Sequence, residues 1–125
     1  MQLQQIIEDL RAFLPAKDFA KSREFYGALG FEQVWSSDKL ALFKLGRVSF
    51  FVQDYFVKDW AENMMLDLRV GDVQAYWSYL QGLDLPGRFP GVRVSAPQDD
   101  LATGIRRGNL CDPCGVLWHF SQSIG

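Results

Sequence analysis

The side chains that could carry acid–base or metal chemistry are few. His119 is the only histidine, and Cys111 and Cys114 are the only cysteines. Their C-D-P-C spacing is found in redox pairs and in halves of zinc sites, but a structural zinc takes four ligands. A redox pair usually begins a helix, where the dipole lowers the thiol pKa, whereas Asp-Pro-Cys-Gly is typical of a turn between strands. We therefore expect both cysteines to be turn and strand-end residues.

His119 has two interpretations. It is a base or hydrogen-bond partner in a cavity, paired with Asp67, whose carboxylate would favour the charged imidazole. Alternatively it is a strand histidine satisfied by a neighbouring group, which is the interpretation we favour. With one histidine and a cysteine at a turn, no Ser-His-Asp or Cys-His arrangement can be argued. The sequence therefore does not indicate nucleophilic catalysis.

Aromatic residues concentrate in the middle of the chain. Aromatic side chains in a cavity stack on planar ligands, and packing in the core is the alternative, favoured for Phe43. Trp60 lies in the polar segment QDYFVKDWAEN, which favours a binding role or a place in a dimer interface. The concentrated residues are Trp35, Phe43, Phe51, Tyr55, Phe56 and Trp60.

Charged residues offer a weaker signal. Acidic residues could form a rim that attracts a cationic ligand, or they are simply solvated; they are Asp54, Asp59, Glu62, Asp99 and Asp100. Arg106 and Arg107 are consecutive in a predicted strand, so only one of them can line a cavity.

The composition excludes several classes of partner. The net charge is −2, and the 13 Lys and Arg residues are scattered, whereas a nucleic-acid site needs a basic stripe. No apolar run approaches the length of a membrane span. The start MQLQQIIEDL has acidic residues where a secretory signal would be basic. We expect a cytoplasmic protein that binds neither nucleic acid nor membrane.

The elements that would position these side chains occur twice. Asp18 and Asp72 are predicted helix N-caps, and Gly30 and Gly82 are predicted helix ends. One predicted strand precedes each helix and three follow it. The predicted strands are 10–16, 31–36, 39–44, 47–53, 64–70, 92–95, 104–110 and 116–121, with the segment 55–63 joining the two copies.

Alternation assigns the strand residues to two faces. The helices must cover one face, which carries Leu10, Ala12, Leu14, Leu66, Leu68, Val70, Val116, Trp118 and Phe120. The other face mixes apolar and polar side chains, which is typical of a small-molecule site, although a solvated sheet face would look similar. That face carries Arg11, Phe13, Met65, Asp67, Arg69, Leu117, His119 and Ser121.

Three segments resemble the vicinal oxygen chelate superfamily, which includes glyoxalase I, extradiol dioxygenases and bleomycin resistance proteins. They are DFAKSREFYGALGF, SFFVQDYFVKDWAENMMLDLRVGDVQAYW and GIRRGNLCDPCGVLWHF. The resemblance implies an α+β fold in which two β-α-β-β-β modules, about 10–53 and 64–121 of a single domain 1–125, form a curved mixed sheet with a cavity. It also implies a homodimer.

The metal enzymes of this superfamily place His or Glu ligands on inward strand positions. By the resemblance, those positions fall on Arg11, about Phe50, Met65 and His119, and only His119 could bind a metal, with Asp67 as one substitute. The resemblance thus implies no metal and no cofactor. We expect a binding protein of the bleomycin-resistance type, not an enzyme, that sequesters an aromatic or cationic compound.

A metal-dependent lyase, isomerase or oxygenase of the same superfamily is the alternative function, and a protein with a vestigial cavity is a third. The expected ligand-binding residues are Phe13, Trp35, Phe51, Trp60, Asp67, Arg69 and His119.

Overall fold

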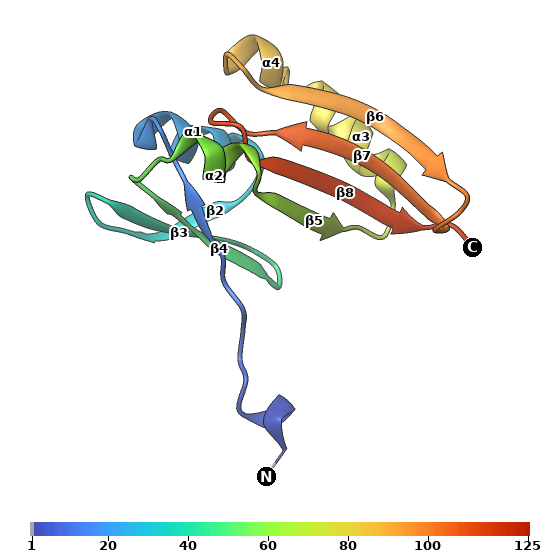
Figure 1. Cartoon of the computed structure of the whole chain (residues 1–125), viewed down its shortest axis with the longest axis horizontal. Coiled ribbons are helices and arrows are strands. Elements are labelled where there is room, and N and C mark those ends of the chain that lie inside the picture. Colours follow the sequence, from blue (N-terminus) through green and yellow to red (C-terminus); the bar gives the residue numbers. More distant parts are fainter. Residues whose placement is uncertain (1) are drawn as a thin grey trace.

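The computed structural model describes residues 2–125, which form two four-stranded sheets with helices packed behind them (Figure 1). The N-terminal sheet has the strand order β1-β4-β3-β2, and the C-terminal sheet has the order β5-β8-β7-β6. In each sheet the first strand runs parallel to the last, and the other pairs are antiparallel. The predicted α+β class with two β-α-β-β-β units is confirmed.

The bounds of the elements follow the predicted order closely. They are η1 Leu3–Gln5, β1 Phe13–Pro15, α1 Phe19–Ala28, β2 Glu32–Ser36, β3 Leu40–Leu45, β4 Val48–Gln53, α2 Lys58–Glu62, β5 Met65–Arg69, α3 Val73–Gly82, α4 Leu85–Arg88, β6 Arg93–Asp100, β7 Ile105–Cys111 and β8 Leu117–Ser123.

Both predicted N-caps are confirmed. The Asp18 carboxylate accepts a hydrogen bond from the backbone N–H of Lys21, and the Asp72 carboxylate accepts one from Ala75. Gly30 follows α1 with φ of 111°, a left-handed conformation that glycine adopts without a steric penalty. The short helices α2 and α4 were not predicted, because five- and four-residue helices have too few positions to show a periodic pattern.

Two strand predictions need correction. The first strand begins at Phe13 instead of residue 10, and Leu10, expected against the helices, is 91% exposed. Residues 9–12 run beside β4, where the Ser49 hydroxyl donates to Asp9 and the Phe51 N–H donates to the Ala12 carbonyl. The chain before them extends away from the body of the molecule (Figure 1). The sixth strand runs on to Asp100 because a register shift between Ser95 and Gln98 lets the strand pass Pro97.

One continuous core joins the two halves. Tyr26 of α1 and Trp118 of β8 pack together with ring centroids 5.8 Å apart. The Tyr26 hydroxyl donates to Asp112 Oδ2 at 2.7 Å and accepts from Trp118 Nε1 at 3.0 Å. Asp112 Oδ1 accepts the backbone N–H groups of Cys114 and Val116. Burial raises the pKa of the Asp112 carboxyl, although these hydrogen bonds oppose the effect.

Within residues 2–125, none of the helices combines the length and the apolar character that crossing a membrane would require.

Candidate functional site

The face of the N-terminal sheet that lies away from α1 carries an aromatic row. Phe13 on β1 lies opposite Phe51 on β4, Phe51 opposite Leu42 on β3, and Leu42 opposite Trp35 on β2. The Phe13 and Phe51 rings stack with centroids 4.6 Å apart. Phe13 is 50% exposed and Trp35 49%, so the row presents ring surface to solvent. Three residues expected to bind ligand thus share one face, with Leu42 between them.

Trp60 lies beside this row. It belongs to α2 and is 65% exposed, with its ring 6.2 Å from that of Tyr55. A cavity of about 170 Å³ separates α2 from the sheet. The cavity is lined by Phe13, Pro15, Gln53, Tyr55, Val57, Trp60 and Met64. Phe43, by contrast, is buried in the core, as favoured from the sequence.

The corresponding face of the C-terminal sheet is polar. Its strands bring together Asp67 and Arg69 of β5, Ser121 and His119 of β8, and Arg107 and Asn109 of β7; these residues are called the polar face below. Asp67 lies opposite His119, and His119 opposite Asn109. Arg69 lies opposite Ser121, and Ser121 opposite Arg107. The two rows are adjacent on the same side of the sheet.

Hydrogen bonds on the polar face distinguish the two interpretations of His119, and the bond to a neighbouring group agrees with the favoured one. The partner of His119 Nδ1 is Asn109 Oδ1, at 2.6 Å, and not Asp67. The Asp67 carboxylate instead accepts from the Ser121 hydroxyl at 2.6 Å, and Arg69 donates to Ser121 at 3.3 Å. Because the amide oxygen can only accept, Nδ1 carries the proton and Nε2 is the nitrogen left for a ligand.

The structure shows which of the two consecutive arginines lies on the open face. Arg106 lies on the side of β7 that carries Gly108 and Leu110, and it forms an ion pair with Asp99 at 2.6 Å. Arg107 lies on the polar face. The charge of Asp99 is therefore offset, and Asp54 lies 4.0 Å from Lys39. These pairs favour solvated loop charge over an acidic rim.

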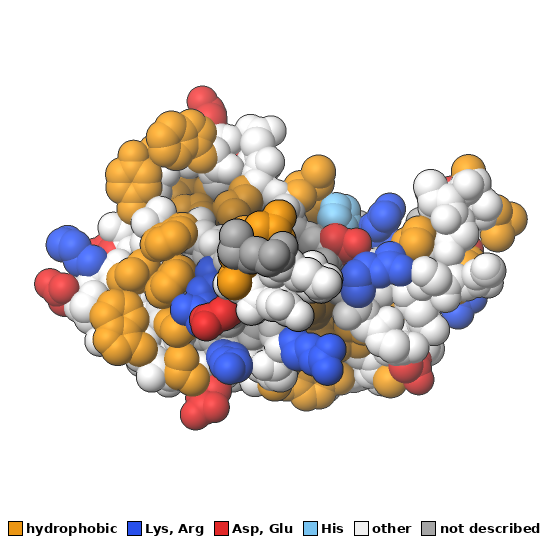
Figure 2. Space-filling model, turned by 90° about the horizontal axis from the view of Figure 1, so that it is seen from below, with side chains coloured by type: hydrophobic (Ala, Val, Ile, Leu, Met, Phe, Trp, Pro, Cys, Tyr) orange, Lys and Arg blue, Asp and Glu red, His pale blue; other side chains and the backbone are white. Residues whose placement is uncertain are grey.

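Figure 2 shows hydrophobic side chains gathered on the left, and the histidine beside charged side chains at a hollow on the upper edge. A further cavity of about 360 Å³ lies between the sheets. Its lining residues are Leu10, Ala12, Val48, Ser49, Phe50, Leu66, Asp67, Leu68, Arg69 and Trp118. Asp67 and Arg69 thus line this cavity as well as the polar face.

The presumed metal positions do not fit a metal ion. Phe50 itself is buried with its ring against Tyr26 and Trp118, and its neighbours Ser49 and Phe51 lie on the opposite side of β4. The Arg11 guanidinium donates to Asp9 and Ser49. Within residues 2–125 no three His, Cys, Asp or Glu side chains lie close enough together to hold a metal. Of the carried-over positions, only His119 offers a side chain that commonly binds metals.

The cysteine motif is structural, as expected. Cys111 ends β7, and Cys114 lies in the turn that Asp112 and Gly115 close. Both thiols are free. The Cys114 thiol donates to the Pro15 carbonyl at 3.2 Å, and burial raises its pKa to about 12. A thiol with such a pKa is not a nucleophile near neutral pH.

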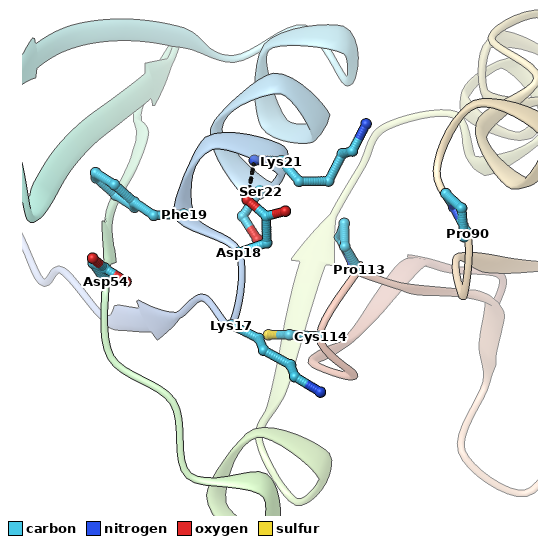
Figure 3. A pocket seen from close by; sticks show the side chains of 9 residues that line it. All are labelled: Lys17, Asp18, Phe19, Lys21, Ser22, Asp54, Pro90, Pro113 and Cys114. Atoms are coloured by element: carbon cyan, nitrogen blue, oxygen red, sulfur yellow. Dashed lines mark hydrogen bonds between the residues drawn. The ribbon is translucent and has the colours of Figure 1, made fainter.

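A cavity of about 630 Å³ lies on another part of the surface, at the start of α1 (Figure 3). Three of its polar groups already serve the fold: Asp18 caps α1, Lys21 lies 3.6 Å from Glu24, and Cys114 bonds to the backbone. Figure 3 shows the ammonium groups of Lys17 and Lys21 pointing outward, away from the Asp18 carboxylate. We do not assign a ligand to it.

Two residues of the open faces were missed from the sequence. Asn109 has no signal beyond alternation in β7, and Leu42 reads as an ordinary core residue. Leu42 belongs to the aromatic row because it lies opposite Phe51, and Asn109 belongs to the polar face because it lies opposite His119. Strand register is not visible in a single sequence.

Neither protein-family models nor the sequences of curated proteins match this chain. Solved structures do match it. A bleomycin-binding protein complexed with bleomycin has a TM-score of 0.79 at 22% identity, covering 94% of this chain and 99% of that one. A bleomycin resistance determinant encoded on the transposon Tn5 has a TM-score of 0.77 at 21% identity, covering 92% and 98%.

An enzyme is similar as well. Lactoylglutathione lyase from Agrobacterium tumefaciens has a TM-score of 0.67 at 16% identity, covering 93% of this chain and 94% of that one. The same two-module architecture therefore serves both binding proteins and a lyase. These matches confirm the resemblance at the level of the fold: the chain shares its fold with a bleomycin-binding protein, a bleomycin resistance determinant and a lactoylglutathione lyase.

Proposed function

We propose that this protein binds a planar aromatic small molecule without a metal and without transforming it. The aromatic row carries this proposal. It presents stacked and half-exposed rings on three of the four strands of the N-terminal sheet, with Leu42 between them on β3. Exposed ring surface of this kind marks a ligand or partner site. The similarity to a bleomycin-binding protein in complex with bleomycin supports the same class of function.

All seven expected residues have a part in this proposal. Phe13, Trp35, Phe51 and Trp60 stack on the planar part of the ligand. Polar groups at one end then orient it; they are those of Asp67, Arg69 and His119. Residues 1–125 act as one domain, because Tyr26 and Trp118 tie both halves to one core.

The sequence led us to expect an aromatic or a cationic compound, and the polar face supports the cationic compound less well. The polar face carries two arginines and one aspartate, so a ligand that was only a cation would meet a net positive surface. A planar ring is what the aromatic row selects. The alternative function is that of a metal-dependent lyase or oxygenase. The similar fold of a lyase supports this alternative. It has less support from the side chains, because no three His, Cys, Asp or Glu residues within residues 2–125 lie close together.

We also propose that the protein acts as a homodimer in the cytoplasm, with no nucleic acid as partner. The extended N-terminal segment supports the dimer. It exposes four large aliphatic side chains: Leu3 63%, Ile6 56%, Ile7 64% and Leu10 91%. A second copy of the chain would bury them.

The test is calorimetric titration of chelator-treated protein with bleomycin and with 2-naphthamide, a neutral planar compound. We expect binding without metal and recovery of both compounds unchanged. Trp35→Ala and Trp60→Ala should each weaken binding by about tenfold. Leu101→Ala, which removes an exposed loop side chain, is the control. Failure of planar compounds to bind, or conversion of a bound compound, would contradict the proposal.

A further inference from the structure

We propose that the ligand carries an anionic group, such as a carboxylate, and that Arg107 binds this group on the polar face. The inference rests on the proposed function and names the class of compound that the site takes: a planar ring with an acidic substituent. The observation behind it is a half-buried guanidinium without a partner of its own.

Arg107 is half-buried in the middle of the C-terminal sheet. Its Nε is shielded from solvent and has no hydrogen-bond partner within residues 2–125. The ion pairs of these residues include Arg106 but not Arg107. Shielding a charged group without an acceptor is costly, and a ligand carboxylate would supply an acceptor in the planar geometry that a guanidinium prefers.

The groups beside Arg107 favour an anion over a cation. Arg107 and Arg69 lie on the two strands flanking Ser121, which places their Cα atoms about 10 Å apart on one face. The Asp67 carboxylate is engaged by the Ser121 hydroxyl, to which Arg69 also donates. The negative charge of the face is thus already bonded within the chain, whereas the charge of Arg107 is not.

The aromatic row and the polar face divide the ligand between them. A cavity of about 360 Å³ lies between the two sheets, and Asp67 and Arg69 of the polar face line it. A ring held at the aromatic row would direct a substituent toward the C-terminal sheet. This arrangement gives specificity for the acid, because a neutral analogue leaves the guanidinium without an acceptor.

The experiment compares three compounds with the same ring: 2-naphthoate, 2-naphthamide and 2-naphthylmethylammonium. Dissociation constants are measured by calorimetry for the wild-type protein and three variants. We expect naphthoate to bind at least about tenfold more tightly than naphthamide, and the ammonium compound to bind most weakly. Arg107→Gln should abolish the preference for the acid without changing the affinity for naphthamide, and Arg107→Lys should keep part of it.

Arg106→Gln is the matched control, since it removes the same charge from the neighbouring residue on the opposite face. It should keep the full preference. If naphthoate and naphthamide bind equally well, if the ammonium compound binds best, or if the preference survives Arg107→Gln, the inference is overturned and the proposed function stands. If none of the three compounds binds, the proposed function fails and the inference fails with it.

Discussion

The two sheets share a strand order and a pattern of parallel and antiparallel pairs, yet their open faces differ in chemistry. The N-terminal sheet presents an aromatic row, and the C-terminal sheet presents the hydrogen-bonded side chains of the polar face. Their helix-covered faces, in contrast, are both apolar and merge into one core. The same topology thus constrains the covered face tightly and leaves the open face free to vary.

This difference indicates how such a repeat can bind an asymmetric ligand. Two similar sheets with identical open faces would bind two similar groups. One aromatic and one polar face instead distinguish the two ends of a single compound, because rings are selected by stacking and charges by hydrogen bonds.

The largest effect should come from the core that holds the two faces together. Asp112→Ala leaves the Tyr26 hydroxyl and two backbone N–H groups without their acceptor, so the free energy of unfolding should fall by about 3 kcal/mol. Asp112→Asn keeps one acceptor oxygen and should lose less. Urea denaturation followed by tryptophan fluorescence and by circular dichroism measures the effect, with Asp99→Ala as the surface control.

The two probes should also report a single transition, because one core serves both halves. Separate transitions for the two signals would mean that the two sheets unfold independently, as two domains would.

Removing a ring from the aromatic row should strongly weaken binding of a neutral planar compound. Phe51→Ala removes the ring that stacks on Phe13, so the affinity for 2-naphthamide should fall about thirtyfold. Leu45→Ala is the matched control, because Leu45 is an exposed apolar residue on the other side of the same sheet. Equal losses for both variants would remove the distinction between the two sides of the sheet.

The extended N-terminal segment should matter for assembly more than for folding. Ile6→Asp combined with Ile7→Asp places charges where two exposed aliphatic side chains would be buried in a dimer. The dimer dissociation constant, measured by analytical ultracentrifugation, should rise about tenfold or more, with little change in thermal stability. A wild-type protein that stays monomeric at micromolar concentration would contradict the dimer.

The smallest effect concerns alkaline pH. The pKa of Cys114 is raised from 9.0 to about 12, so between these values the unfolded thiol ionises while the folded thiol keeps its proton. Its contribution to stability is fully present below pH 9 and is lost as the pH rises toward 12. Burial also raises the pKa of Tyr26, which adds to the loss above pH 10.

The free energy of unfolding should therefore fall with rising pH in this range. Cys114→Ala should make that slope shallower, as measured by urea denaturation at several pH values between 8 and 10.5, roughly the range that spans the usual thiol and phenol pKa values. An unchanged slope would show that the thiol is not protected in the folded state.

Much of the fold followed from the sequence alone. The α+β class and the repeated β-α-β-β-β unit were predicted from local signals. These signals were the N-caps Asp18 and Asp72, the helix end at Gly30 and the order of the alternating runs. The errors lie where local patterns are short or ambiguous. Leu10 alternates with buried residues but lies beyond the strand, and α2 is too short for a period to show.

The side of the sheet on which a residue lies was largely determined by the sequence, because strand side chains alternate with a period of two. That rule placed Phe13, Asp67 and His119 on the open faces. The position about Phe50 came from the resemblance and not from this rule, and in the structure Phe50 lies on the covered face while Ser49 and Phe51 lie on the open one.

Only the tertiary structure decided which residues meet. Strand register placed both Asp67 and Asn109 beside His119, and the side-chain hydrogen bonds gave Asn109 to His119 and Ser121 to Asp67. Register also placed Arg106 opposite Asp99, with which it pairs. It also joined Phe13, Phe51 and Trp35 into one row from three strands. The physical reason is that alternation is a property of one strand, whereas neighbours across a sheet depend on how separate strands align, and that alignment is set by the packing of the whole core.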